Sequence, residues 1–242
     1  MNARRHSIAV RIGTVTVGGD APISVQSMTK TDTRDVAATT AQVQALARAG
    51  SDIVRLAVPD MEAAAALPEI RAGSPVPLVA DIHFDHRLAL AAIDAGIDAL
   101  RLNPGNMRRR EHLEKVVARA KEREIPIRIG VNAGSLPASY RPDEPLPVRM
   151  VALAEEQVRV LESMDFGLIK ISLKASDVTT TIEAYSQMAH RVAYPLHLGV
   201  TEAGPPSTGL VRNAIGIGVL LHLGIGDTIR VSLSGDPLLE VD

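Results

Sequence analysis

The chain has 242 residues, a net charge of −2, 46% hydrophobic and 2% aromatic residues, and no cysteine. This length suits a single α/β barrel, whose core must be built from Ala, Val, Leu and Ile. The charge gives no electrostatic case for nucleic acid or an anionic membrane. We see neither a transmembrane run nor a secretion signal and expect a cytoplasmic location. Without cysteine there is no disulfide and no thiolate for zinc or an iron–sulfur cluster.

Short apolar segments alternate with longer helical patterns along most of the chain. The expected strands lie at residues 23–28, 52–58, 78–83, 99–103, 127–132, 168–174, 196–201 and 228–233. The expected helices lie at residues 35–49, 61–72, 86–95, 111–122, 148–164, 177–192 and 208–223. This alternation predicts right-handed βαβ units and a parallel sheet. Glycines that can end helices in a left-handed conformation follow three of these patterns, at Gly50, Gly96 and Gly224.

Eight strands and seven helices predict a closed TIM (β/α)₈ barrel that lacks its eighth helix. An open doubly wound sheet is the alternative, but the evenly spaced units show no topological switch point. Residues 10–19 alternate and end in Gly-Gly, which predicts a short β-hairpin plugging the barrel floor. We therefore expect an N-terminal extension at residues 1–22 and a barrel domain at residues 23–242. The missing helix predicts an exposed apolar groove between the first and seventh helices.

Charged and amide side chains stand in the carboxyl-terminal halves of the predicted strands. Side chains two or four residues apart in a strand point the same way. The resulting sets are Arg101 with Asn103, Arg128 with Asn132, Lys170 with Ser172 and Lys174, Arg230 with Ser232, Asp81 with His83, and Arg55 alone. Any single cation could pair with an acid or extend outward to the helices. Because five strands carry cations to one rim, the pattern predicts an anion site that suits a diphosphate better than a carboxylate.

The carboxylates expected at this rim are few, namely Asp81, Asp85, Glu202 and Asp236. Glu202 ends the seventh strand, where it could deliver a proton to a leaving hydroxyl or pair with a rim arginine. Asp81, His83 and Asp85 are residues of the kind that bind divalent metals, but no ligand from a third strand accompanies them. His197 can be read either as a core residue or as a ligand.

Eight sequence blocks together closely resemble the family of 4-hydroxy-3-methylbut-2-enyl diphosphate synthases, the iron–sulfur enzymes of the methylerythritol phosphate route to isoprenoids. The blocks are VQSMTKTDTRDV, DIVRLAVPDMEAA, PLVADIHFDHRLAL, LRLNPGN, IPIRIGVNAGSL, KISLKASDV, PLHLGVTEAG and GIGDTIRVSL. They run in order from about Val25 to the end of the chain. The resemblance implies that the barrel binds 2-C-methyl-D-erythritol 2,4-cyclodiphosphate. The family opens this ring reductively, removes water and releases (E)-4-hydroxy-3-methylbut-2-enyl diphosphate.

The resemblance also implies roles for particular residues. The implied diphosphate contacts are Arg55, Arg101, Asn103, Arg128, Asn132, Lys174, Arg230 and Ser232. Lys174 is preferred over Lys170 on this basis. Asp81 and His83 would line the same pocket, and Glu202 would be the acidic residue near the reacting hydroxyl.

The family implies further parts that this chain does not contain. Its members carry a [4Fe-4S] cluster in a C-terminal domain, receive electrons from ferredoxin or flavodoxin, and form homodimers in which that domain closes over a barrel. Because this chain has no cysteine to hold the cluster, we expect a separate barrel domain with no bound cofactor or metal. Such a domain should bind the diphosphate and be inactive on its own.

Two other functions stay open from the residues alone. Asp81, His83 and Glu202 could serve a metal- or acid/base-dependent lyase or isomerase that acts on a phosphorylated sugar. The other alternative is a barrel that binds phosphate and performs no catalysis. A bound divalent metal would favour the first of these, whereas affinity for ordinary sugar phosphates is expected of both.

Overall fold

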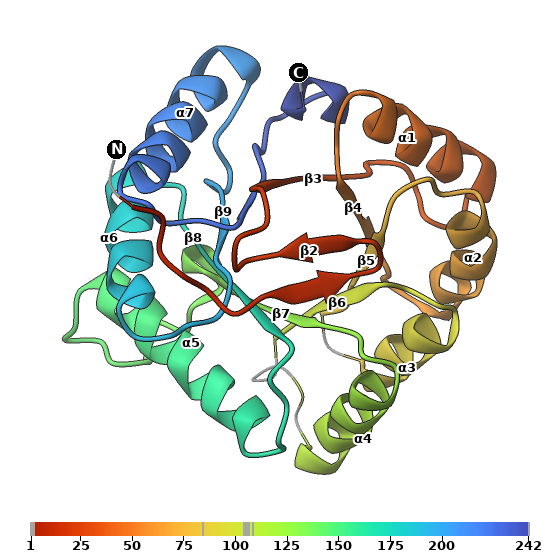
Figure 1. The fold of residues 1–242 in the computed structure, drawn as a ribbon, viewed down its shortest axis with the longest axis horizontal. Helices are drawn as coiled ribbons and strands as arrows, with labels where there is room; N and C mark the ends of the chain where they lie inside the picture. The colour runs from red at the N-terminus through yellow and green to blue at the C-terminus, as the bar shows by residue number, and fades with distance from the viewer. Residues whose placement is uncertain (1–2, 84, 104–106, 108, 242) are drawn as a thin grey trace.

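The strands of the protein form a ring that is surrounded by helices (Figure 1). The computed structural model describes residues 3–83, 85–103, 107 and 109–241. An eight-stranded sheet has the order β8-β7-β6-β5-β4-β3-β10-β9, and its paired strands are parallel. An isolated parallel bridge between Ile171 and Leu196 joins its two ends. The predicted TIM barrel is therefore confirmed.

The barrel elements follow the predicted order. The barrel strands are β3 (Ser24–Met28), β4 (Ile53–Ala57), β5 (Leu78–Asp81), β6 (Ala99–Leu102), β7 (Ile127–Asn132), β8 (Ile169–Lys174), β9 (His197–Leu198) and β10 (Thr228–Ile229). The α-helices are α1 (Val36–Arg48), α2 (Met61–Ala72), α3 (His86–Asp94), α4 (Arg110–Glu122), α5 (Leu146–Glu162), α6 (Val178–Ala189) and α7 (Pro206–His222). Two 3₁₀ turns complete the described part, η2 (Ala133–Ser135) and η3 (Pro237–Glu240). No described helix is both long and apolar enough to cross a membrane.

Local signals in the sequence explain where the helices begin and end. The side chains of Asp35, Asp60 and Asp177 each accept a hydrogen bond from a backbone N–H in the first turn of α1, α2 and α6. The three predicted helix-ending glycines have φ angles of 110°, 81° and 78° at Gly50, Gly96 and Gly224. Because the barrel strands are parallel, their carboxyl ends and the loops that follow them lie at the same end of the barrel.

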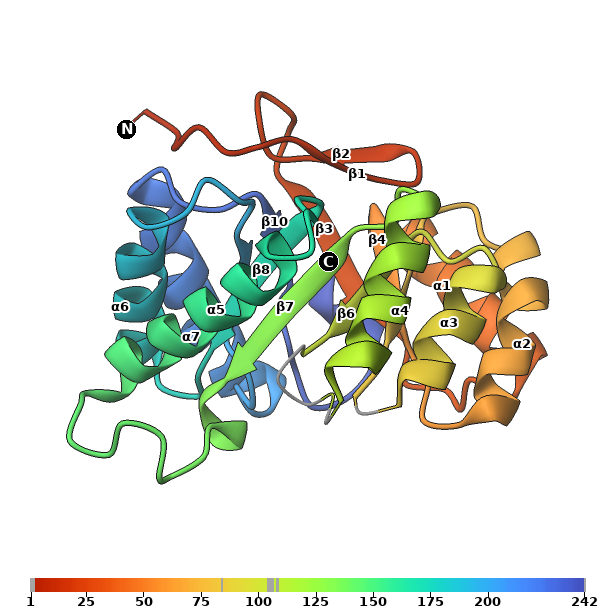
Figure 2. The same cartoon turned by 90° about the horizontal axis from the view of Figure 1, so that it is seen from below.

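The predicted hairpin covers the opposite end of the barrel, as Figure 2 shows from the side. It consists of β1 (Val10–Ile12) and β2 (Val15–Val17), which pair antiparallel. Its apolar side chains Ile12 and Val17 are fully buried and pack against Ile53, Val79 and Ala99, which come from β4, β5 and β6. The hairpin therefore plugs the barrel floor, and the opposite end, where the strands finish, is left for a ligand.

The C-terminal residues occupy the place of an eighth helix. The turn η3 packs against α1 and β3 in the interval between α7 and α1 (Figure 1). Leu210, Val211 and Ile215 of α7 are exposed. The apolar groove that we expect between α1 and α7 stays a prediction.

The strands β9 and β10 are shorter than the segments predicted for them, 196–201 and 228–233. Gly199 has a φ of 156°, which departs from regular strand geometry directly after β9. The pairing still continues by one hydrogen bond, because the backbone N–H of Arg230 donates to the oxygen of Leu198 at 3.0 Å. Arg230 and Ser232 therefore follow β10 in an extended segment outside the ladder proper.

Candidate anion-binding site

Register across four neighbouring strands lines up most of the predicted cations. Asp81 on β5 pairs with Arg101 on β6, which pairs with Arg128 on β7, and Arg128 pairs with Lys170 on β8. At the carboxyl end of the same ladder Asn132 pairs with Lys174. Residues on the other face of these strands, such as Leu100 and Ile129, are buried in the main hydrophobic core. Strand parity thus separates a polar barrel interior from the apolar layer under the helices.

Asp81 is the acid around which two arginines gather. Its side chain is nearly buried; Arg101 Nη1 lies 3.1 Å from Oδ1, and Arg55 Nε lies 3.6 Å from Oδ2. Burial is the largest influence on the pKa of Asp81 and raises it, but Arg55, Arg101 and Arg128 outweigh it, so the pKa lies below its ordinary value. Asp81 is therefore ionised at neutral pH and holds the two guanidinium groups in place.

Arg55 keeps hydrogen-bonding capacity for a ligand although Asp81 lies close to it. Its Nε and Nη2 lie 3.3 and 2.8 Å from the thioether sulfur of Met28, which is a weak acceptor. Burial lowers the pKa of the guanidinium to about 10, although Asp81 acts in the other direction. The group stays charged at neutral pH and retains donor capacity for a stronger acceptor.

Arg128 is buried at 4% exposure and has no ion pair with any carboxylate of the described residues. Its Nη1 donates to the Ser172 hydroxyl at 2.5 Å, while Nε and Nη2 find no partner in the described part of the chain. Burial lowers its pKa well below the ordinary value, and the nearby Arg55 and Arg101 add to this effect. An unpaired buried cation with free donors is costly unless an anion completes it.

Lys174, at the end of β8, is also buried at 6% exposure and makes no ion pair within the described ranges. Burial lowers its pKa well below the ordinary value, and Arg230, Arg128 and Arg55 repel the charged form further. The bare backbone of Gly199 makes room for it, because a Cβ there would lie 2.6 Å from Lys174 Nζ. Lys174 and Arg128 are thus two neighbouring basic side chains that have no ion-pair partner in the described part of the chain.

Glu240 is a buried acid at this site, and the sequence analysis did not predict it there. It reaches in from η3, where Oε2 lies 3.4 Å from Arg230 Nη2 and Oε1 lies 3.3 Å from Lys30 Nζ. Oε1 also accepts from the backbone N–H of Leu233 at 3.0 Å, which ties η3 to the segment after β10. The only sequence signal was a lone glutamate in the apolar run PLLEV. Glu240 partly neutralises Arg230 and holds the last strand of the ring in place.

The remaining predicted residues lie around this group and are more exposed than its buried members. His83 has a 57% exposed side chain, and its Nδ1 lies 3.5 Å from Arg101 Nη1. Asn103, Asn132 and Ser232 are half-buried at the ends of β6, β7 and the segment after β10. The rest of the LRLNPGN block, residues 104–106, lies outside the described residues. These residues all lie at or just after the carboxyl ends of their strands, and their roles as ligands stay predictions.

Glu202 is exposed in the loop after β9 and has a φ of 52°. Left-handed backbone is uncommon for a residue other than glycine and recurs at functional positions. Of the other predicted rim carboxylates, Asp85 caps α3 and bonds Arg87, which lowers its pKa to about 2, and Asp236 caps η3. Asp85 and Asp236 are thus committed to helix ends rather than to the site.

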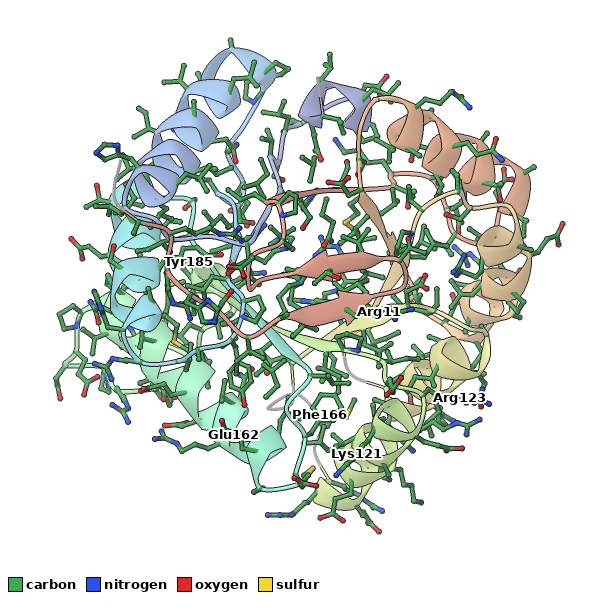
Figure 3. The ribbon with its side chains drawn as sticks, viewed as in Figure 1. Arg11, Lys121, Arg123, Glu162, Phe166 and Tyr185 are labelled. Atoms are coloured by element: carbon green, nitrogen blue, oxygen red, sulfur yellow. The ribbon has the colours of Figure 1, made fainter. Side chains whose placement is uncertain are left out.

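Tyr185 helps to hold the interior strands of this site together. It extends from α6 toward the strands (Figure 3), accepts a hydrogen bond from the backbone N–H of Leu173 at 3.0 Å and donates to the backbone oxygen of His197. The hydroxyl therefore links β8 to β9 at the point where the ladder itself provides only a bridge. The burial of this hydroxyl raises its pKa well above the ordinary value, so it stays a neutral donor.

Balanced over the interior, cations exceed acids. Among the described residues, the buried carboxylates that pair with Arg55, Arg101, Arg128, Lys174 or Arg230 are Asp81 and Glu240, whereas buried Asp227 pairs with Arg4 and Arg5. Each additional unpaired charge in such a low-dielectric setting increases the gain from a bound anion. Fold and charge together define a TIM barrel whose interior is rich in donors of the kind that suit phosphate oxygens.

Gly130 offers a test of this geometry, because its position lets Arg101 fold across β7. A Cβ at Gly130 would lie 2.9 Å from Arg101 Nε and 3.2 Å from Nη2. We expect Gly130→Ala to displace the guanidinium and weaken binding of inorganic diphosphate about tenfold, while the free energy of unfolding changes by less than about 1.5 kcal/mol. Titration calorimetry checks this. Gly134→Ala is the control, since its Cβ would meet nothing within 4 Å, and equal affinities of the two variants would contradict the placement of Arg101.

Comparison with known proteins assigns this barrel to a family. A sequence profile of the GcpE TIM-barrel domain matches residues 7–242. The 4-hydroxy-3-methylbut-2-en-1-yl diphosphate synthase (flavodoxin) of Dehalococcoides mccartyi is 61% identical over 241 residues, which are 100% of this chain and 69% of that protein. The protein of the same name from Magnetococcus marinus is 56% identical over 98% of this chain and 65% of its own length. The chain belongs to the 4-hydroxy-3-methylbut-2-en-1-yl diphosphate synthase family and comprises its GcpE TIM-barrel domain.

Solved structures agree on the fold. A dihydropteroate synthase from Stenotrophomonas maltophilia superposes with a TM-score of 0.74 over 98% of this chain and 95% of that one, at 16% identity. A 3-dehydroquinate dehydratase from Geobacillus kaustophilus gives a TM-score of 0.63 over 97% and 92%, also at 16% identity. At such identities the likeness establishes the barrel and carries no argument about the reaction.

The residues of this chain do not fit the iron–sulfur cluster that the family resemblance implies. Such clusters are held by cysteine thiolates, and the sequence contains none. Within the described residues, no group of three or more His, Cys, Asp or Glu side chains is arranged to hold a metal ion.

Proposed function

We propose that this chain is the substrate-binding barrel of a 4-hydroxy-3-methylbut-2-en-1-yl diphosphate synthase and that it binds 2-C-methyl-D-erythritol 2,4-cyclodiphosphate at the carboxyl ends of its strands. The proposal places the barrel domain at residues 23–242, after an extension at residues 1–22. The observation that carries it is the excess of buried cations, above all Arg128 and Lys174, which lack a protein counter-charge within the described residues. A diphosphate supplies two negative charges and several acceptor oxygens at once.

The proposed roles follow from where each group stands. Arg101 and Arg55, held by Asp81, would bind one side of the diphosphate, and Arg128, Lys174 and Arg230 the other. Asn103, Asn132 and Ser232 would add neutral donors at the rim, and His83 would line the pocket beside Arg101. Glu202, in its left-handed loop, would hold a proton near the hydroxyl that leaves as water. Together these groups bind and orient the ring for reductive opening.

The electrons for ring opening lie outside the chemistry of this chain's residues, so we expect no turnover from the chain alone. The relatives named above carry flavodoxin in their names, and the proposal includes flavodoxin or ferredoxin as the external donor of the complete enzyme. It also includes a cytoplasmic location and a homodimer. The exposed apolar side chains Leu210, Val211 and Ile215 on α7 support self-association.

Calorimetric titration of the 242-residue chain tests the proposal. We expect the cyclic diphosphate to bind at one site per chain and about 10 to 100 times more tightly than a sugar monophosphate, because a second phosphate adds charge-assisted hydrogen bonds worth roughly 1.5–3 kcal/mol. An assay with reduced flavodoxin should show no product. Equal affinity for both ligands would point to a general phosphate-binding barrel, and product formation by the pure chain would refute the assignment of the reducing step to another domain.

A further inference from the structure

Lys170 is a buried cation that the proposed function does not use. It stands on β8 four residues before Lys174, and its register partner on β7 is Arg128. Only 2% of the residue is exposed, and its Nζ finds no hydrogen-bond partner among the described residues. A lysine in this position has the same inward orientation as Ser172 and Lys174 but lies deeper in the barrel, toward the hairpin.

Among the residues that the structure describes, no group facing Lys170 supplies a free negative charge. From β9 comes His197, which is fully buried, and burial together with the surrounding cations lowers its pKa well below the ordinary value, so the ring stays neutral. The acid whose charge acts on Lys170 is Asp227, before β10, but the oxygens of Asp227 are already engaged. They accept from Arg4 Nη2 at 2.9 Å, the Ser7 hydroxyl at 2.7 Å and the Leu196 N–H at 2.8 Å.

The charge state of Lys170 is therefore set by its buried surroundings. Burial is the main cause that lowers its pKa to about 7, the positive charge of Arg128 lowers it further, and Asp227 opposes both. In the empty barrel the amine is thus close to half-protonated at neutral pH. An anion bound by Arg128 offsets the repulsion between Arg128 and a protonated Lys170. It also brings negative charge to the level of the barrel at which these two register partners lie.

We propose that Lys170 takes up a proton when the diphosphate binds at the barrel mouth, so that substrate binding is coupled to proton uptake and Lys170 acts as a positioning residue beneath the phosphate groups. The proton comes from solvent and becomes the third N–H of the ammonium. This inference rests on the proposed function, because it needs a diphosphate anion at Arg128. It gives a role to Lys170, which is not among the predicted diphosphate contacts and lies closer to the hairpin than Lys174 does.

The direction of the pH dependence follows from the position of Lys170. Below pH 7 the amine is already protonated in the empty barrel, so binding takes up little additional charge there. Above pH 7 the empty barrel holds a neutral amine and the complex an ammonium. The affinity should then fall by up to tenfold for each pH unit over the range where one full proton is taken up.

Titration calorimetry of the chain with 2-C-methyl-D-erythritol 2,4-cyclodiphosphate, in buffers of different ionisation enthalpy at pH 6, 7 and 8.5, measures this uptake directly. Both phosphates of this ligand are esterified within the ring, so the ligand lacks the second ionisation near pH 6 of a phosphate monoester. We expect the wild-type chain to take up about one proton more at pH 8.5 than Lys170→Met. Lys115→Met removes an exposed lysine of α4 and should match the wild type.

The outcomes separate this inference from the function on which it rests. Absence of binding at every pH would overturn both. Tight binding with the same proton uptake in the wild type and Lys170→Met would overturn the inference alone. If Lys170→Met does not fold, the ¹³Cε resonance of Lys170 in the labelled wild-type chain decides instead, because its titration must move to higher pH when the ligand is added. An unmoved titration would overturn the role of Lys170.

Discussion

Replacing Arg128 by methionine should weaken binding of the cyclic diphosphate by about 100-fold, and it should do so without destabilising the barrel. The guanidinium has two unpartnered nitrogens within the described structure and is the central cation of the register ladder. Losing one bidentate, charge-assisted contact costs roughly 3 kcal/mol of binding free energy, or about two decades of affinity. Calorimetry with the wild-type chain as reference measures the change.

The stability of the same variant gives the complementary result. Because Arg128 is buried without an ion-pair partner in the described structure, an apolar side chain of similar length removes an uncompensated charge. We expect the free energy of unfolding of Arg128→Met to be unchanged or higher by about 1–3 kcal/mol. Arg159→Met, on the exposed side of α5, is the control and should alter neither affinity nor stability. Unchanged diphosphate affinity in Arg128→Met would count directly against the site.

The second large effect is expected from Asp81→Asn, which should destabilise the fold, whereas Arg128→Met should not. Asp81 binds Arg101 at 3.1 Å and Arg55 at 3.6 Å in the barrel interior. Removing its charge leaves two buried guanidinium groups without compensation, which costs about 3–5 kcal/mol of folding free energy. Urea unfolding measures the loss. Asp94→Asn breaks a surface pair with Arg119 and should cost less than about 1 kcal/mol.

The pH dependence of stability should report the same carboxylate. The folded-state pKa of Asp81 lies below its ordinary value, so its stabilising contribution is present above the unfolded pKa of about 4 and is lost as pH falls through the lower folded value. The difference in unfolding free energy between the wild type and Asp81→Asn should therefore be constant near neutral pH and shrink below about pH 4. A difference that does not depend on pH would show that Asp81 acts through packing instead of charge.

Much of the barrel could be predicted from the sequence because each signal involved is local. Period-two alternation placed Arg101, Arg128 and Lys174 on the interior face. In the structure Arg101 and Arg128 are register partners, and Lys174 lies at the end of the next strand, in register with Asn132. The helix-ending glycines and the hairpin likewise depend on residues close in sequence. These features need no knowledge of what lies across the barrel.

What the sequence could not show depends on contacts between distant residues. Glu240 partly neutralises Arg230 only because η3 folds back against β3 and α1, and nothing local in PLLEV indicates that an acid enters the interior. The alternation of side chains along a strand also cannot show that Lys170 has no ion-pair partner among the described residues, since that depends on Asp227 being engaged by the N-terminal segment. Charge balance in a closed barrel is a property of the whole ring.

The proposed function requires that cations from separate strands converge on a single diphosphate at the carboxyl end of the barrel. A crystal structure of the chain with 2-C-methyl-D-erythritol 2,4-cyclodiphosphate tests it most directly. We expect phosphate oxygens within hydrogen-bond distance of Arg101, Arg128 and Lys174. Arg11 and Arg123 line a hollow on the opposite, hairpin end (Figure 3). A diphosphate bound there, with the interior cations left without it, would contradict the account.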